Sequence, residues 1–256
     1  HFVGTNLSYT HLDQFSDASS PSFLPTNLRI QLHQFRGDVF WEGRFREEWE
    51  STLTLAYQRL QYEELSEHQH ITEATADVTR HYGAGGASGV TLEAYAGVGW
   101  FDERLAREAD GTDIPAEEAR EFQYGPKLTW EHAVTALPGL VLEVKPSLRV
   151  SQPLDGAYFD YLLVKAEAGL TYTVGIVTAT AQGTYSLRDY LDREVAGDPQ
   201  TTPTYQETLR ARLGLEVALR ESLAVYGEWE AERNFSDSVV DDYEAHRVTF
   251  GARLGF

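Results

Sequence analysis

Residues 90–100, VTLEAYAGVGW, alternate between apolar and polar or small side chains at every position. In an extended chain this alternation gathers the apolar side chains on one face, which carries Val90, Leu92, Ala94, Ala96, Val98 and Trp100. The run is longer than the usual strand of about 5–6 residues in a soluble protein. It matches the roughly 9–11 residues that a tilted strand needs to cross a bilayer. The segment therefore predicts a membrane-spanning β-strand.

The same alternation returns along the rest of the chain. It recurs in residues 122–130, 140–150, 162–172, 177–187, 209–217, 223–231 and 248–256. Shorter alternating runs in residues 1–13, 28–32 and 53–57 predict further strands. A soluble sandwich or small barrel would also alternate, but its strands are usually shorter and its apolar faces point inward. The strand lengths therefore favour a membrane barrel.

The connections between these segments alternate in length. Short turns are expected at residues 84–87, 135–139, 173–175 and 219–222. Longer polar loops are expected at residues 13–26, 63–71, 102–120, 151–158, 189–204 and 234–242. Short turns at one end and long loops at the other are typical of outer-membrane barrels. We therefore predict an all-β fold, a closed antiparallel up-and-down transmembrane β-barrel, as a single domain over residues 1–256.

Counting strands back from Phe256 gives about twelve, an even number that puts both termini at the short-turn end. The region 27–62 fits least well. Residues 36–38, Arg-Gly-Asp, resemble a turn, and residues 44–50 are highly charged. A barrel of 14 strands is the alternative, with residues 39–45 as a separate strand.

Composition excludes several other classes. The net charge of −19 argues against a nucleic-acid partner, which needs a basic face. The 42% of hydrophobic residues is too high for a disordered acidic chain. There is no cysteine, and hence no disulfide scaffold or cysteine-based metal site. The mean hydropathy of −0.39 is low, as expected when only alternate strand residues meet lipid. The chain begins at His1, so we expect a mature form from which a signal peptide was removed.

The last residues, RVTFGARLGF, resemble the terminal strand of Gram-negative outer-membrane β-barrels. Those strands commonly end on an aromatic residue preceded by apolar residues at alternating positions. The residues that match are Phe250, Ala252, Leu254 and Phe256. The resemblance implies a location in the bacterial outer membrane and recognition of this strand by the barrel-assembly machinery. It also implies contact with outer-membrane lipid and lipopolysaccharide.

Aromatic residues gather near the predicted strand ends, as expected for rings at the lipid headgroup level. Near the long-loop end they are Trp100, Phe101, Phe122, Tyr124, Phe159, Tyr161, Tyr185, Trp229 and Tyr243, and near the other end Trp130, Tyr172, Phe250 and Phe256.

Pro126 and Pro146 fall on lipid-facing positions inside strands. Proline lacks a ladder donor, so a bulge or local irregularity is expected where these two strands meet.

If the apolar faces meet lipid, the opposite faces line a lumen of mixed charge. The candidate lumen and selectivity residues are Glu93, Lys127, Glu131, Glu143, Lys145, Arg149, Lys165, Glu167, Arg210, Arg212, Glu216, Glu228, Glu230 and Arg253, with Glu121, Arg188 and Glu232 on the same faces. Charges in a low-dielectric wall need partners, so cross-strand pairs of Arg or Lys with Glu are expected. Such a network could fill the lumen or line an open pore. Small inward residues, among them Gly169 and Thr180, favour open volume.

Signatures of catalysis are weak. No histidine is followed two residues later by serine, the spacing that outer-membrane phospholipases carry. Asp237, Asp241, Asp242 and His246 lie near one rim, where a solvated acidic loop is the simpler interpretation. We therefore expect no enzyme, no catalytic residue and no cofactor. His68 and His70 alternate within an acidic segment and are weak candidates for a shared divalent metal.

These observations predict a porin-like channel or secretion pore that passes small polar solutes or a polymer through a mixed-charge lumen. The alternative is a non-conducting barrel that anchors or docks a larger cell-envelope assembly, with envelope proteins as partners. An outer-membrane enzyme is the third possibility.

Overall fold

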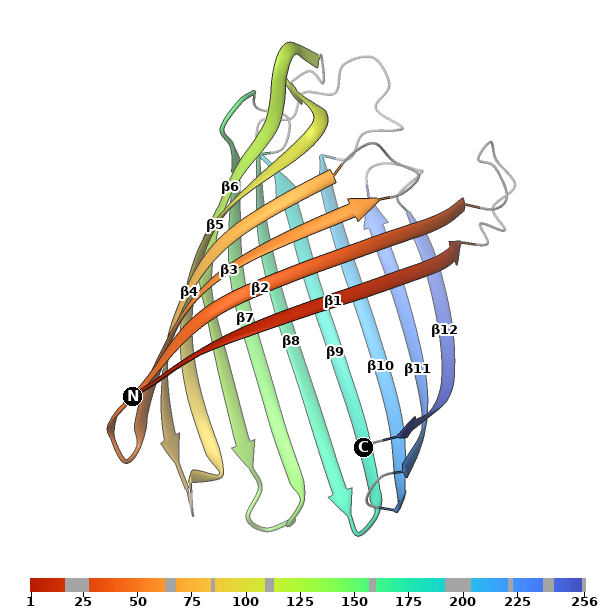
Figure 1. Cartoon of the computed structure of the whole chain (residues 1–256). Coiled ribbons are helices and arrows are strands. Elements are labelled where there is room, and N and C mark those ends of the chain that lie inside the picture. Colours follow the sequence, from red (N-terminus) through yellow and green to blue (C-terminus); the bar gives the residue numbers. More distant parts are fainter. Residues whose placement is uncertain are drawn as a thin grey trace.

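The computed structural model describes residues 1–16, 28–62, 68–83, 86–108, 113–156, 160–191, 204–220, 223–236 and 242–254. These residues form twelve strands and no helix (Figure 1). The strands are β1 (Phe2–Ser16), β2 (Leu28–Arg46), β3 (Trp49–Tyr62), β4 (His68–Tyr82), β5 (Ser88–Arg107), β6 (Asp113–Ala133), β7 (Leu140–Pro153), β8 (Tyr161–Val174), β9 (Val177–Tyr190), β10 (Tyr205–Arg220), β11 (Leu223–Ser236) and β12 (Tyr243–Leu254). Among the described residues no helix is long and apolar enough to cross a membrane.

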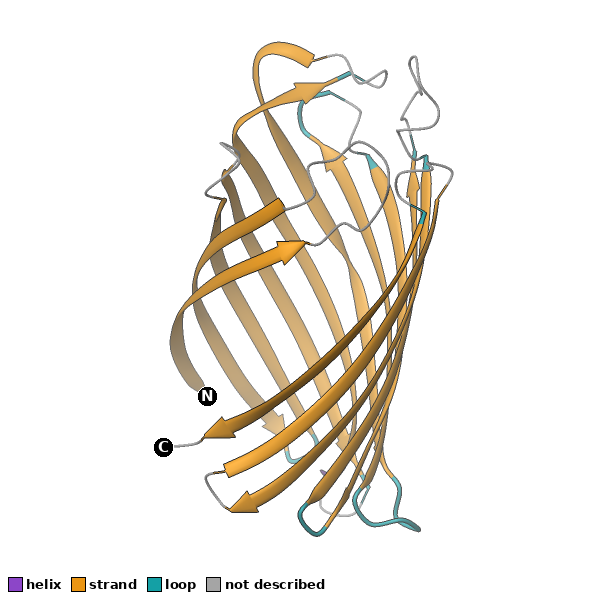
Figure 2. Cartoon of the chain, turned by 90° about the vertical axis from the view of Figure 1, so that its right-hand side faces the viewer, coloured by secondary structure: helices purple, strands orange, loops and turns teal. Residues whose placement is uncertain are grey.

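The strands form one antiparallel sheet in which each strand pairs with the next along the chain, from β1 to β12. This confirms the predicted up-and-down topology and the count of twelve. Figures 1 and 2 show the sheet rolled around a central space, with both termini in the half that carries the short turns. Pairings of the described residues end at β1 and β12, and the sealing of the barrel between these two strands stays a prediction.

The prediction of a turn at residues 36–38 is wrong, and so is the alternative of 14 strands. β2 runs without a break through Gly37, and the turn that follows lies at residues 47–48. Arg36 and Asp38 both lie on the polar face of β2, where Arg36 contacts Glu73 of β4. Their charge therefore reflects an inward-facing strand position.

The predicted long loop at residues 102–120 is also largely strand. β5 continues to Arg107 and β6 begins at Asp113, so only a short connection remains between them. Figure 1 shows this hairpin rising above the other strands. Beyond Trp100 the pairing shifts register twice, so the hairpin bends as it leaves the wall.

The short turns lie at one end, as predicted. They connect β2 to β3, β4 to β5, β6 to β7 and β8 to β9, and the β8–β9 turn is only two residues long. Gly175 in that turn has a φ of +57°, which residues with a side chain rarely adopt. The remaining connections of this end and most of the long loops fall outside the described residues.

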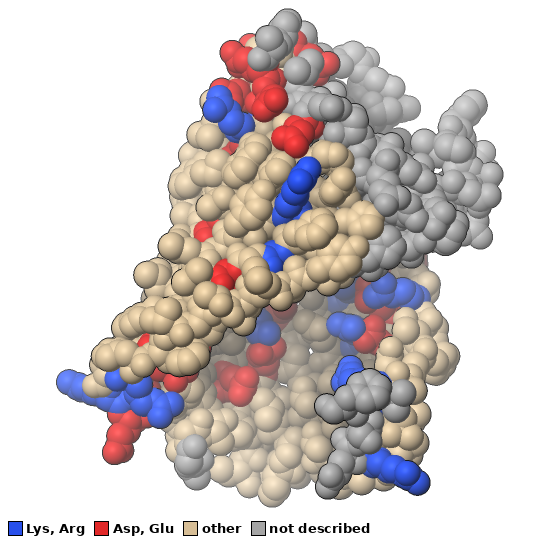
Figure 3. All heavy atoms as spheres, in the orientation of Figure 1, with Lys and Arg blue, Asp and Glu red and all other residues tan. Residues whose placement is uncertain are grey.

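The outer face of the sheet is apolar. Figure 3 shows a broad surface around the middle of the barrel in which uncharged residues predominate, with acidic side chains near the top of the β5–β6 hairpin. The exposed residues include Leu92, Leu128, Leu148, Val164, Leu213 and Val248. Such a band would be unfavourable in water and is stable when lipid covers it, because every second strand residue then meets hydrocarbon. The apolar faces predicted from the sequence are therefore the outer faces.

The C-terminal strand carries its apolar residues outward. Phe250 on β12 is 80% exposed, and Ala252 is exposed on the same face. Leu254 ends β12, and Phe256 lies outside the described residues.

Phe159 of the predicted aromatic belt also lies outside the described residues. Tyr161 and Tyr243 were expected in the belt, but the strand register puts both on the inner face, opposite Ser151 and Asn234.

The two strand prolines interrupt the ladder between β6 and β7. Described pairs stop between Tyr124 and Lys127, and again between Lys127 and Trp130. The partners on either side keep the same register, so the expected irregularity is a gap in hydrogen bonding without a bulge.

Candidate functional site

The inner face of the sheet forms a charged lumen. A cavity of about 600 Å³ is lined by side chains from β2 to β8, which face one another across the interior. Two further cavities, of about 490 and 420 Å³, lie along the inner faces of β6 to β12. Figure 3 shows acidic and basic side chains inside the hollow below β1 and β2. Gly169, Gly214 and Thr180 line these cavities, where larger side chains would narrow the space.

One group of ion pairs lies on β2 to β8. Lys127 and Glu93 are register partners on β6 and β5, and Lys127 Nζ lies 3.3 Å from Glu93 Oε2. Arg36 reaches across β3 to Glu73, at 3.0 Å between Nη2 and Oε1. These contacts neutralise part of the wall of the 600 Å³ cavity.

Two further pairs of this group form within single strands. Lys145 contacts Glu143 at 2.7 Å, and Lys165 contacts Glu167. Lys145 and Glu167 are nevertheless register partners on β7 and β8. The four side chains therefore alternate in sign across two neighbouring strands.

A second group of ion pairs joins β10, β11 and β12. Arg210 contacts Glu232 and Glu230, and Arg212 contacts Glu228. Arg247 of β12 binds Glu230 from the other side, at 2.8 Å. Glu230 therefore lies between two arginines and joins three strands.

Arg253 and Glu216 extend this group toward the short turns. Arg253 Nη1 on β12 lies 3.0 Å from Glu216 Oε2 on β10, across the intervening β11. Opposite charges on neighbouring strands each contribute roughly 0.2–1 kcal/mol. The ion pairs of this group join the last three strands and add modestly to the stability of their pairing.

Glu131 and Glu143 are like charges directly opposite each other on β6 and β7. Both line the 420 Å³ cavity together with Lys145 and Arg212. Like charges that face each other are destabilising in a sheet unless cations lie nearby. The fourteen candidate residues share the inner face of the sheet by strand register, and their role in selectivity stays a prediction.

Sequence reasoning missed several charged residues of the inner face, and four of them line the cavities of about 600 and 490 Å³. They are Arg36, Glu73, Asp77 and Arg247. Three of them lie in the N-terminal third of the chain, where β2 and β4 lack a clean alternation of apolar and polar residues. The sequence held one sign of them: Glu73 and Asp77 are an even number of residues apart, so both fall on the same face of β4.

Comparison with known proteins gives a likeness of fold only. No protein-family model matches the chain, and no curated protein matches it by sequence. Among solved structures, the translocator domain of the autotransporter NalP from Neisseria meningitidis matches with a TM-score of 0.37 and 12% identity, covering 99% of this chain and 88% of that chain. The β domain of the Bordetella autotransporter BrkA has a TM-score of 0.44 and 10% identity, covering 99% of both chains. The outer-membrane protein OmpT of Vibrio cholerae, in its trimer form, has a TM-score of 0.44 and 11% identity, covering 98% of this chain and 99% of that chain.

The chain has the fold of a bacterial outer-membrane β-barrel. Its twelve long strands, its apolar outer band, its short turns at one end and its C-terminal strand carry that assignment, and they place it in the outer membrane. At 10–12% identity, no residue role is transferred from the solved structures.

The prediction that the chain is not an enzyme is corrected. A barrel fold does not by itself exclude catalysis, because one fold can carry many functions. Of the acidic residues noted near the rim, Asp242 binds Arg233 at 2.6 Å, while Asp237 and Asp241 lie outside the described residues. The enzymatic status of the barrel is therefore open.

His70 already has partners on both ring nitrogens. The Tyr57 hydroxyl lies 2.7 Å from Nδ1, Asp102 Oδ2 lies 3.1 Å from Nε2, and the ring stacks on Trp100. His68 Nδ1 is buried without a hydrogen-bond partner among the described residues. In the described part of the chain, no group of three or more potential metal ligands is found. The two histidines therefore belong to the outer face of β4, near the aromatic belt.

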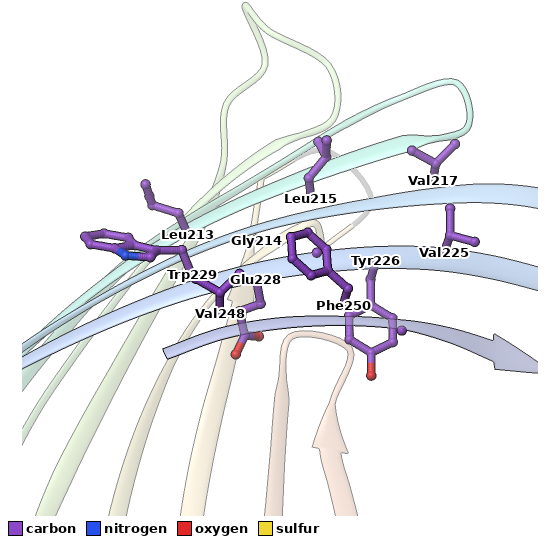
Figure 4. Close-up of a pocket in the computed structure, with 12 residues that line it drawn as sticks. Leu213, Gly214, Leu215, Val217, Val225, Tyr226, Glu228, Trp229, Val248 and Phe250 are labelled. Atoms are coloured by element: carbon purple, nitrogen blue, oxygen red, sulfur yellow. The ribbon is translucent and has the colours of Figure 1, made fainter. Parts of the chain in front are cut away.

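An apolar groove crosses the outer face of β10, β11 and β12. Figure 4 shows Leu213, Leu215, Val225, Trp229 and Phe250 around it, while the Glu228 and Tyr226 side chains point to the opposite side of the sheet. Gly227 lies between Leu215 and Phe250, and the Phe250 ring packs over it, since a Cβ there would lie 3.1 Å from two of the ring atoms. Because it belongs to the lipid-facing band, we treat it as part of the membrane surface.

Proposed function

We propose that this barrel is a channel through which small polar solutes cross the outer membrane. The observation that supports it best is the set of cavities, of about 420 to 600 Å³, along a charged inner wall. A lumen packed shut by side chains would leave little such space. Charged walls around a water-filled path give such channels their ion selectivity.

Single-channel conductance of the refolded protein in a planar bilayer tests this proposal. Steady current steps, with a non-zero reversal potential in a salt gradient, are the expected result. A folded, heat-modifiable barrel that passes no current would contradict the channel. The alternative, a non-conducting barrel that docks an envelope assembly, would then be favoured by the ion-pair group on β10 to β12.

Charge reversal in the lumen should change which ions pass. In Lys145→Glu or Arg212→Glu, a cation of the wall becomes an anion beside Glu143 or Glu228. We expect the cation-to-anion permeability ratio to rise by roughly two-fold or more, because a ring of acidic groups attracts cations. Reversal potentials in a salt gradient give this ratio.

Arg80→Glu is the matched control for these variants. Arg80 lies on the outer face of β4, with its guanidinium 5.7 Å from the Trp49 ring centre. The same change of charge outside the lumen should leave the permeability ratio close to that of the wild type. An equal shift in all three variants would mean that Lys145 and Arg212 do not line the conducting path.

A further inference from the structure

Two luminal arginines differ from the other basic residues of the wall. Arg149 on β7 and Arg188 on β9 have no carboxylate partner among the residues that the structure describes, whereas the arginines and lysines paired above each contact one. Tyrosines hold them instead. Arg149 Nε donates to the Tyr95 hydroxyl at 2.6 Å, and its guanidinium lies 5.1 Å from the Tyr95 ring centre.

Arg188 is held in a similar way. Its guanidinium lies 4.8 Å from the ring centre of Tyr161, and Nη1 donates to the Tyr190 hydroxyl at 3.4 Å. Its Nε is buried and has no hydrogen-bond partner among the described residues. A buried donor without a partner is costly, so a shift of the guanidinium that lets this N–H reach an acceptor in the lumen would be favourable.

The strand register places Arg149 and Arg188 two strands apart at the same level of the wall. Leu163 of β8 pairs with Arg149 on one side and with Arg188 on the other. Neighbouring strands lie about 4.8 Å apart, so the two Cα atoms are roughly 10 Å apart on the same face. Two arginine side chains can reach one small ligand across that distance.

Glu121, an acidic residue of β6 on the same face, is already engaged by neutral donors. Glu121 accepts hydrogen bonds from Ser151 at 3.1 Å and from Gln123 at 2.8 Å. Gln123 also donates to the Tyr161 hydroxyl at 3.3 Å, which joins the acid to the tyrosine under Arg188. The Glu121 carboxylate thus accepts from neutral donors, and among the described residues no ion pair joins a carboxylate to Arg149 or Arg188.

We propose that Arg149 and Arg188, framed by Tyr95 and Tyr161, form an oxyanion-binding site in the long-loop half of the lumen, for the carboxylate or phosphate group of a solute. The planar guanidinium fork matches both groups and binds them through two parallel hydrogen bonds. The tyrosines hold the arginines in place without neutralising them. The site would give the proposed channel a preference for anionic solutes. Anion binding itself does not depend on conduction, and only the passage of the solute rests on the proposed function.

Equilibrium binding by the detergent-folded protein tests the site without conduction. Isothermal titration with inorganic phosphate and with glucuronate at low salt should show binding of one or both, and glucose should not bind. Tighter binding of phosphate or of glucuronate decides which of the two groups the site prefers. No binding of either anion at millimolar concentration would overturn the proposal.

Arginine variants test which residues bind. Arg149→Gln and Arg188→Gln should each weaken the affinity for the bound anion by roughly ten-fold or more, since each removes charged hydrogen-bond donors. Arg149→Lys should restore only part of the affinity, because the ammonium lacks the fork. Each variant must keep the heat-modifiable mobility of the folded barrel.

Arg44→Gln is the matched comparison. It removes the same charge from the same residue type, near the short-turn end, where Arg44 contacts Glu50 at 3.4 Å. A loss of affinity as large as in Arg149→Gln would show that general charge, not this site, binds the anion. Anion binding by a barrel that passes no current would support the site and contradict the channel. A conducting barrel without anion binding would do the reverse.

Discussion

Replacing Ala168 with arginine is expected to lower the free energy of unfolding in lipid by about 2–4 kcal/mol. Ala168 is exposed on the outer face of β8 (Tyr161–Val174), near the middle of the strand. An arginine there would place a guanidinium near the middle of the hydrocarbon layer, where water and headgroups are farthest away. Equilibrium unfolding in urea from lipid vesicles measures the change.

The matched control moves the same side chain to the lumen. Gln182 of β9 lines the 420 Å³ cavity and lies opposite Gly169, the residue next to Ala168. Gln182→Arg should change the free energy of unfolding by less than about 1 kcal/mol, since the new charge meets water and the acidic groups of the cavity. If both variants were equally destabilised, the outer face of β8 would not face lipid.

The strands could be predicted because one physical rule governs the wall. Lipid on one side and water on the other force alternation on every strand, so the membrane-spanning parts of β5 to β12 are visible in the sequence. The rule weakens where a strand leaves the membrane. Residues 102–107 include four charged side chains and no alternation, because the β5–β6 hairpin extends beyond the other strands, and they were therefore expected to form a loop.

The prediction of a turn within β2 failed for a different reason. Gly37 between Arg36 and Asp38 reads as a turn, but Gly37 faces outward and the two charges face the lumen. A charge on an inward position and a small residue on an outward position obey the same alternation as the rest of the barrel. The inward direction of Arg36 becomes clear only from its ion pair with Glu73 on β4, which the sequence does not show.

The lumen residues were predictable, while their partners were not. Inward positions follow from the period of two, which is local. Pairing depends on register and on side-chain reach, so Lys145 contacts Glu143 of its own strand while its register partner Glu167 contacts Lys165. The proposed anion site arises in the same way, because only the register shows that Arg149 and Arg188 flank Leu163.

Gly125→Ala should destabilise the barrel by about 3 kcal/mol, because the new methyl group has no space. Gly125 lies on β6 beside the interrupted part of the β6–β7 ladder, and a Cβ there would lie 2.9 Å from the Leu148 carbonyl carbon and 3.2 Å from Arg149 Cα. These are backbone atoms, so the two strands must separate. Gly183→Ala on β9 is the control, since a Cβ there has no atom within 4 Å. Urea unfolding of both variants decides the matter. Equal stability would mean that the strands do not approach at Gly125, whereas a selective loss would show that glycine permits the close contact that places Arg149 in the wall.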